Sequence, residues 1–254
     1  MNFGNAIKIA KQVFNTLTEY IQGPCHGNQQ TLAQSRLWDA VVGFLHVFAH
    51  LQDKLAQDTN SSTDLLNKLL DLQQDMIVML LSMLEGNVVN GTIGKMLLDT
   101  FCEAQVDVEM IMNFFTTFLK LSNLQDTEKM RGKDPEEKGL ILRKDFIEVL
   151  EDTNVYNLSE QEFLLKCIKF DESNRFNFKQ FCEDYHNPSM DIGFNLAVLL
   201  TNLKEHMNGE PKLQRFILMA GDMFDYRVVF KLIFCANNPR FCLNLGFQVR
   251  YHVF

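Results

Sequence analysis

The stretch Asp134-Pro-Glu-Glu-Lys-Gly-Leu-Ile-Leu-Arg-Lys-Asp145 has the length and residue spacing of a twelve-residue loop between two helices. Acidic residues stand at its first, third and twelfth positions, which are Asp134, Glu136 and Asp145. Gly139 takes the sixth position, where such a loop turns so sharply that glycine is favoured. We therefore predict a helix–loop–helix unit centred on this stretch.

A second loop of the same form, Lys169 to Gln180, begins 35 residues after the first. Asn174 stands at its sixth position, where the tolerance of asparagine for left-handed backbone can replace that of glycine. Ile141 and Phe176 occupy the eighth positions of the two loops, and we expect a short β contact between them. The helix expected between the loops has the spacing of a capping box at Ser159 to Glu162. Together these features predict an EF-hand pair.

Neither loop offers calcium a good set of ligands. The residues at the ligand positions are Asp134, Glu136, Lys138, Leu140 and Asp145 in the first loop and Asp171, Ser173, Arg175 and Gln180 in the second. Calcium takes about six to eight oxygen atoms, including a bidentate carboxylate at the twelfth position. Lys138 brings a positive charge to the fifth position, Lys169 replaces an acid at the first, and Gln180 replaces the carboxylate at the twelfth. The sequence therefore predicts weak or incomplete calcium sites in a mainly structural module.

Before residue 122, apolar residues recur at three- and four-residue steps, which is the pattern of amphipathic helices. We expect helices over residues 5–21, 30–56, 65–84, 95–103 and 106–121. Short links and the lack of a strand pattern predict an all-α fold, a solenoid-like helical segment with an inserted degenerate EF-hand pair. The predicted divisions are a solenoid-like segment over 1–121, the EF-hand pair over 122–190, and a returning helical segment over 191–226.

Residues 227–254 differ from the rest of the chain, because they hold four basic residues, six aromatic residues and no acid. We assign this basic aromatic tail no structural role and hypothesise that it is a truncation artefact, such as read-through or an aberrant splice product. The whole chain has a formal net charge of -8, which repels nucleic acid.

The longest apolar run in the body, Met76 to Leu81, is far shorter than a membrane span, so we expect no transmembrane segment. The first residues lack the features of a secretory signal, which favours a cytosolic chain. The six cysteines show no CxxC spacing, and we expect free thiols with neither disulfides nor structural zinc.

Sequence motifs of catalysis are weak in this chain. His46 and His50 lie four residues apart on one expected helix, as in zinc proteases, but the glutamate that such a motif carries between them is absent. The sequence suggests no third ligand, so we expect local bonding of these histidines rather than zinc. We find no glycine-rich phosphate loop, nucleophile elbow or catalytic triad. We predict that the protein is not an enzyme and keep a zinc hydrolase as the least favoured alternative.

Four stretches closely resemble the cytosolic region of ryanodine receptors, the calcium-release channels of the sarcoplasmic and endoplasmic reticulum. They are Lys11 to Cys25, Ser35 to His50, Leu84 to Gly91 and Asp191 to Asn202. The shorter stretches Leu17-Thr-Glu-Tyr20 and Gln22-Gly-Pro-Cys25 also resemble inositol trisphosphate receptors. The resemblance covers about residues 3 to 226.

The resemblance implies a core-solenoid segment with an EF-hand pair, placed on the cytosolic face of the reticulum membrane. Other segments of a tetrameric channel and regulatory proteins would be its partners, and calcium its ligand. In the family, a calcium-activation site uses carboxylates of this solenoid. By motif, Glu19 resembles one of those carboxylates, and Gln22 lies near it as a supporting residue.

We therefore predict a fragment of a ryanodine-receptor-type channel that contributes calcium sensing and regulatory coupling and has no pore of its own. The alternative is a soluble helical scaffold that binds protein partners without calcium.

Overall fold

The computed structural model describes residues 3–23, 25–58, 63–86, 91–125, 128–134, 138–206, 211 and 213–221. The predicted tail, residues 227–254, lies outside the described residues, and so does Glu136 of the first loop.

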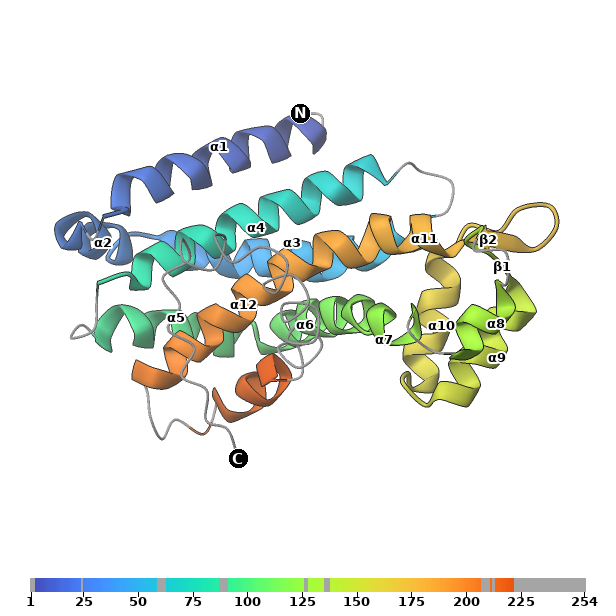
Figure 1. The fold of residues 1–254 in the computed structure, drawn as a ribbon. Helices are drawn as coiled ribbons and strands as arrows, with labels where there is room; N and C mark the ends of the chain where they lie inside the picture. The colour runs from blue at the N-terminus through green and yellow to red at the C-terminus, as the bar shows by residue number, and fades with distance from the viewer. Residues whose placement is uncertain are drawn as a thin grey trace.

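The prediction of an all-α fold is confirmed, since the described part of the chain is helical apart from one small antiparallel sheet (Figure 1). Residues 213–221 are also helical. The elements are α1 (Phe3–Ile21), α2 (His26–Ala33), α3 (Leu37–Gln57), α4 (Asp64–Leu84), α5 (Gly91–Glu103), α6 (Gln105–Leu119), α7 (Leu121–Gln125), α8 (Glu128–Lys133), β1 (Leu140–Leu142), α9 (Arg143–Thr153), α10 (Leu158–Cys167), β2 (Arg175–Asn177), α11 (Phe178–Phe181), η1 (Cys182–His186) and α12 (Asn187–His206).

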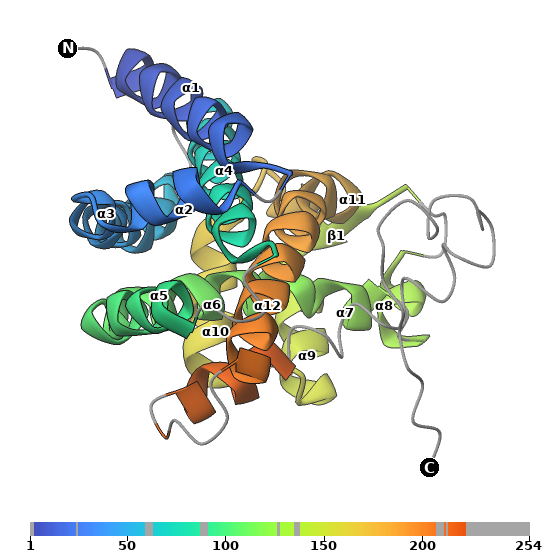
Figure 2. The same ribbon diagram turned by 90° about the vertical axis from the view of Figure 1, so that its left-hand side faces the viewer.

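The long helices form a layered array. In the view of Figure 2, α1, α3 and the α5–α6 pair lie one below another, and α4 and α12 lie beside them. Helix α4 packs against α1, α3 and α12, while α3 packs against α5 and α6. This arrangement agrees with the predicted solenoid-like segment, and we call α1 to α6 with α12 the helical array.

Burial follows the predicted periodicity. Helix α4 buries apolar side chains on several sides because α1, α3 and α12 all pack against it. Helix α6 is also buried around most of its circumference, and Phe115 and Phe118 are completely inaccessible to solvent. Such complete burial of a phenylalanine stabilises a fold by about 1.5–3 kcal/mol.

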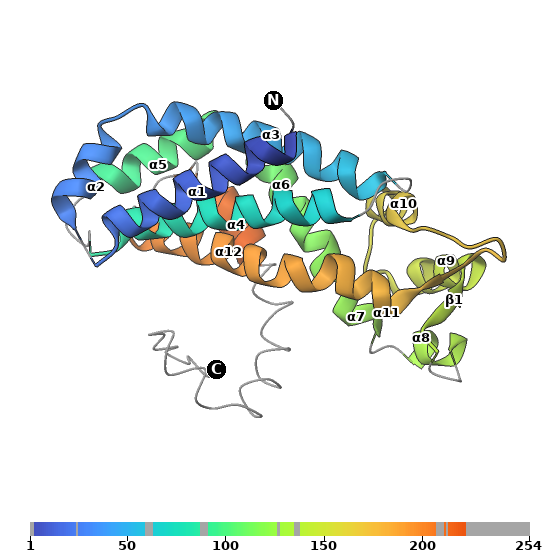
Figure 3. The ribbon, with the colours of Figure 1, turned by 90° about the horizontal axis from the view of Figure 1, so that it is seen from above.

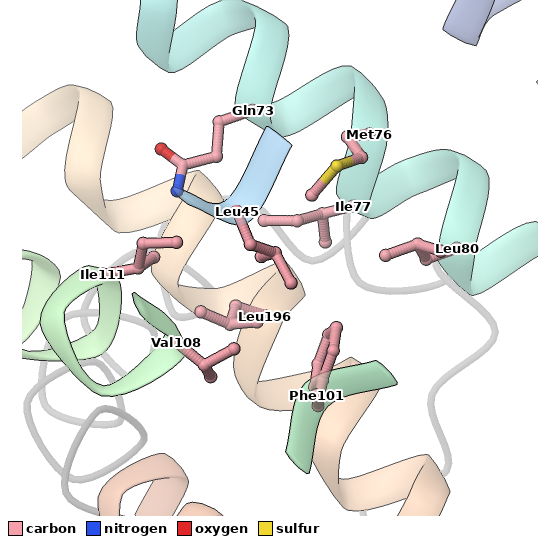
Figure 4. Close-up of a pocket in the computed structure, with 9 residues that line it drawn as sticks. All are labelled: Leu45, Gln73, Met76, Ile77, Leu80, Phe101, Val108, Ile111 and Leu196. Carbon is pink, nitrogen blue, oxygen red and sulfur yellow. The ribbon is translucent and has the colours of Figure 1, made fainter. Parts of the chain in front are cut away.

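The core of the array is closely filled. A cavity of about 10 Å³ lies between α3, α4, α5, α6 and α12 (Figure 4), which is room for about one water molecule. Its lining is apolar apart from Gln73, whose Oε1 atom has no hydrogen-bond partner among the described residues. This cavity is too small for an organic ligand.

The helix predicted over residues 30–56 is wrong in its boundaries, because two helices, α2 and α3, share this region. The side chain of Ser35 explains the break. Its hydroxyl donates a hydrogen bond to the Leu32 carbonyl at 2.6 Å and accepts one from the Leu37 amide at 3.2 Å. Serine thereby competes with the backbone bonds that would continue a helix.

Smaller corrections concern helix ends. Helix α5 begins at Gly91 rather than residue 95, and the predicted helix over 106–121 divides into α6 and α7. Helix α8 lies shortly after the division predicted between residues 121 and 122.

One continuous helical segment, Phe178 to His206, contains α11, η1 and α12. Its middle turn is a π-helical turn in which the Asn187 amide donates to the Cys182 carbonyl. Pro188 follows directly, and a wider turn suits a proline, which lacks an amide donor and crowds the preceding turn. The segment crosses the division expected at residues 190 and 191 and joins the second loop to the array.

The second loop and its neighbours lie at one end of the elongated array in two perpendicular views (Figures 1 and 3). We call α8 to α11 with β1 and β2 the paired-loop module.

Among the described residues, no helix combines the length and apolar composition needed to cross a bilayer. The described cysteines, which are Cys25, Cys102, Cys167 and Cys182, are free thiols as expected. Burial raises the pKa of the Cys182 thiol to about 12, so this thiol is unreactive at neutral pH.

Candidate functional site: the paired loops and their junction with the array

The two loops meet through a short antiparallel sheet. Strand β1 pairs with β2, and Ile141 lies directly opposite Phe176. The predicted contact between the two eighth positions is therefore confirmed. Both side chains are buried, and the Phe176 ring lies with its centroid 5.0 Å from that of Phe146 on α9.

The sharp turns also occur at the predicted positions. Gly139 has φ +73° and Asn174 has φ +56°, so both sixth residues adopt the left-handed backbone. Each loop then bonds to the other, because the Phe178 amide donates to the Gly139 carbonyl at 2.7 Å and the Arg143 amide donates to the Asn174 carbonyl at 2.8 Å. These two backbone hydrogen bonds connect the loops directly.

In the first loop, both terminal carboxylates already have partners within the chain. The Asp134 carboxylate accepts hydrogen bonds from the backbone amides of Lys138 at 3.0 Å and Gly139 at 2.5 Å. The Asp145 carboxylate lies 3.5 Å from the ammonium group of Lys133, which also pairs with Glu148 at 2.6 Å. These partners raise the pKa of Lys133, chiefly through the Glu148 hydrogen bond. A calcium ion would have to compete with this ammonium for the twelfth-position carboxylate.

In the second loop, a side chain of the loop itself carries the positive charge. Asp171 Oδ1 accepts the backbone amides of Ser173 and Arg175, each at 2.8 Å. The Arg175 guanidinium lies 3.5 Å from Asp171 Oδ2. The backbone hydrogen bond from Arg175 is the main cause that lowers the pKa of Asp171 below its ordinary value. The predicted ligand positions 3 and 7 are thus bonded to each other.

The remaining predicted ligand positions contribute little negative charge. Leu140 is exposed in β1, and its position in such a loop supplies a neutral backbone carbonyl rather than a charged side chain. Gln180 donates from its side chain to Asp184 at 3.0 Å, and its backbone amide donates to the Asn177 side chain at 2.9 Å. The structure therefore brings both loops together but pairs their acids with amides and cations of the chain.

The capping box lies two residues earlier than the spacing of Ser159 and Glu162 suggested. Asn157 is the N-cap of α10, and its side chain accepts the Glu160 amide at 3.0 Å. Glu160 in turn accepts the Asn157 amide at 2.9 Å. Asparagine serves as an N-cap as well as serine does, so the pattern at 159–162 was the wrong one of two possible boxes.

A polar and aromatic junction connects the module to the array. The Tyr185 hydroxyl donates to the Ala56 carbonyl at 3.1 Å, and His186 Nδ1 lies 2.9 Å from the Phe118 carbonyl. Because a carbonyl oxygen only accepts, Nδ1 carries the proton. Burial lowers the pKa of His186, which keeps this imidazole neutral at pH 7. The Phe118 and Tyr185 rings stack at 4.8 Å.

A second set of contacts at the junction comes from α10 and the turn before it. The Tyr156 hydroxyl donates to the Thr117 carbonyl at 3.0 Å, and both residues are buried. Lys120 pairs with Glu160 at 2.7 Å, and neither side chain is more than one-fifth exposed. The sequence alone did not indicate these junction residues. The helical periodicity before residue 122 indicated that α6 has a buried face, but it did not indicate which residues contact that face.

Glu19 and Gln22, the residues related by resemblance to a calcium-activation site, lie at the C-terminal end of α1 on the array. Both are exposed. Among the described residues, no hydrogen bond or ion pair holds the Glu19 carboxylate, which leaves it accessible to a ligand.

His46 and His50 on α3 do have a third polar neighbour, which the sequence did not suggest. Asp107, in the first turn of α6, contacts both imidazoles, and one possible ligand atom from each of the three side chains lies within 4.8 Å of the other two. The half-buried Asp53 also lies on α3, and burial raises the pKa of its carboxyl to about 6, against the opposing influence of His50.

Comparison with known families identifies one segment of the chain. Residues 2–45 match the model of a family described as "RyR and IP3R Homology associated". The matched residues comprise α1, α2 and the first part of α3, including Glu19 and Gln22. This match links the chain to channels of the ryanodine-receptor and inositol-trisphosphate-receptor type.

Proposed function

We propose that the chain is a cytosolic regulatory segment of a ryanodine-receptor-type calcium-release channel and has no catalytic role. The match of residues 2–45 to the receptor homology-associated family carries this proposal. Within a tetrameric channel, the segment would lie on the cytosolic side of the sarcoplasmic or endoplasmic reticulum membrane and bind other channel segments.

In this proposal the paired-loop module is an EF-hand pair. Its support is the pairing of Ile141 with Phe176 at the eighth position of each loop, together with left-handed residues at each sixth position. Helices precede and follow both loops, which is the arrangement of EF-hand units.

Calcium binding by this pair would be weak. The ammonium group of Lys133 and the guanidinium group of Arg175 lie beside acids that calcium would need. Removing such a cation from its carboxylate opposes binding, in addition to the missing twelfth-position carboxylate of the second loop. The module would then act chiefly by transmitting movement, since the contacts of Phe163 and Phe181 with Phe118 connect it directly to α6.

Glu19 would supply one carboxylate of a calcium-activation site that other channel segments complete, with Gln22 supporting it. The exposure of both side chains at the end of α1 is consistent with such a shared site. One carboxylate binds calcium poorly by itself, so the site requires the assembled channel.

Co-purification with a full-length ryanodine receptor tests the proposed assembly, and we expect the chain to elute with the channel. A chain that elutes separately while it remains folded would contradict the proposal and favour an independent helical scaffold.

Single-channel recording tests the role of Glu19 in a release channel that carries this segment. Glu19→Ala should lower the sensitivity of opening to calcium, while Asp134→Asn and Asp145→Asn should change it less. Glu103→Ala is the matched control, because Glu103 is also an exposed acid at the end of an array helix. An equal loss in the control, or a larger loss in the loop variants, would exclude the Glu19 assignment.

A further inference from the structure

Three side chains from two helices converge on the surface of the array. His46 and His50 lie one turn apart on α3, and Asp107 lies on α6, which packs beside α3. One ligand atom from each residue lies within 4.8 Å of the other two. Asp107 is only 16% exposed, whereas the side chains of His46 and His50 are 64% and 46% exposed.

We propose that His46, His50 and Asp107 bind a divalent transition metal ion, with Zn²⁺ as the preferred ion. Two imidazoles and one carboxylate are a donor set that zinc commonly uses when its fourth position is left to water. Calcium and magnesium prefer all-oxygen sites, so the metal preference of this site should differ from that of the paired loops. The exposed imidazole edges give a metal ion direct access from solvent.

The distances between these side chains suit ligands of one metal ion, and His46 and Asp107 are also close enough for a long hydrogen bond. His46 Nδ1 lies 3.3 Å from Asp107 Oδ2, and His50 Nε2 lies 3.5 Å from Asp107 Oδ1. Most N–H···O hydrogen bonds are about 2.7–3.2 Å long. Ligand atoms that are about 2.0 Å from a tetrahedral zinc ion lie about 3.3 Å apart, and each imidazole nitrogen lies near this distance from one of the two carboxylate oxygens of Asp107.

The helices hold the ligands in place before a metal arrives. Ala49 and Val108 are the chain neighbours of His50 and Asp107, and both are buried in the core. Rotation of α3 or α6 would therefore expose apolar surface, which keeps the three ligands on the same side of the array. A bound ion would connect α3 to α6 directly.

Isothermal titration of the metal-free full chain with ZnCl₂, in the presence of a reductant and excess calcium, tests the site. We expect one equivalent of zinc to bind. His46→Gln, His50→Gln and Asp107→Asn should each weaken binding by about 10-fold or more. His26→Gln is the matched control, because His26 is exposed on α2 beside Cys25, and it should bind zinc as the wild type does.

Cobalt spectroscopy on the wild type keeps the proposal testable even where a variant fails to fold. Bound Co²⁺ should show visible d–d absorption without a thiolate charge-transfer band, as nitrogen and oxygen ligands require. Circular dichroism of the metal-free variants should match that of the wild type. Wild-type protein that takes up no zinc, ligand variants that bind as tightly as the wild type, or a thiolate band would each overturn the proposal.

Discussion

The two loops of the module reach the same backbone shape by different means. The first turns at a glycine, and its cation, Lys133, comes from the helix before the loop. The second turns at an asparagine, and its cation, Arg175, belongs to the loop itself. Because the same shape forms around different charges, we attribute it to what the two loops share, which is the β contact and the hydrogen bonds between and within the loops.

Truncating the shared contact should produce the largest effect. Phe176→Ala removes a buried ring that lies near Phe146, Phe170 and Phe181, and it should lower the free energy of unfolding by about 3–5 kcal/mol. Chemical denaturation measures this loss. Ile141→Val, which keeps most of the opposite side chain, should cost about 1 kcal/mol. If Phe176→Ala lowers the free energy of unfolding by as little as Ile141→Val does, the β contact does not hold the loops together.

The second largest effect should be a difference in stability between substitutions at the two sixth positions, Gly139 and Asn174. Gly139→Ala places a Cβ atom at positive φ and 3.1 Å from Asn177 Oδ1, so it should lower stability by about 1–2 kcal/mol. Asn174→Gly keeps the left-handed turn and should change stability by about 0.5 kcal/mol or less. The melting temperatures of both variants measure this difference. If Gly139→Ala melts at the same temperature as the wild type, the first loop does not require glycine at its sixth position.

The pH dependence of stability should reveal the contribution of Asp171 in the second loop. The folded pKa of Asp171 is lowered, so its contribution is complete above the unfolded pKa of about 4 and is lost as pH falls through the folded value. Asp171→Asn should therefore lower the melting temperature at pH 7, and this difference should disappear in acid.

Glu172→Gln is the control for that experiment, since Glu172 is the exposed neighbour of Asp171. If the melting temperature of Asp171→Asn equals that of the wild type at pH 7, the hydrogen bonds to Asp171 do not stabilise the second loop.

Calcium affinity should show the smallest change. Lys133→Met frees Asp145 and should raise the calcium affinity of the first loop by about 2–5-fold, the equivalent of one surface ion pair. Lys129→Met is matched to it, because Lys129 pairs with Asp152 in the same module but outside the loop. Calcium titration followed by NMR should place any new response in the first loop, and an equal response in both variants would argue against competition by Lys133.

Local pattern was sufficient for much of the module. The loop lengths, the turns at Gly139 and Asn174 and the contact between Ile141 and Phe176 all depend on residues within or close to each loop. Helical periodicity likewise predicted most of the array. The errors occurred where a single polar side chain alters the backbone, as Ser35 does between α2 and α3.

The chain's amino-acid order was enough to predict the helical class and the contact between the two loops, because both depend on short-range spacing. Packing decided which distant groups meet: Lys133 with Asp145, His186 with the Phe118 carbonyl, and Asp107 with His46 and His50. Periodicity identifies the buried face of a helix but not its neighbour. Contacts between helices far apart in the chain therefore emerge only once those faces are packed together.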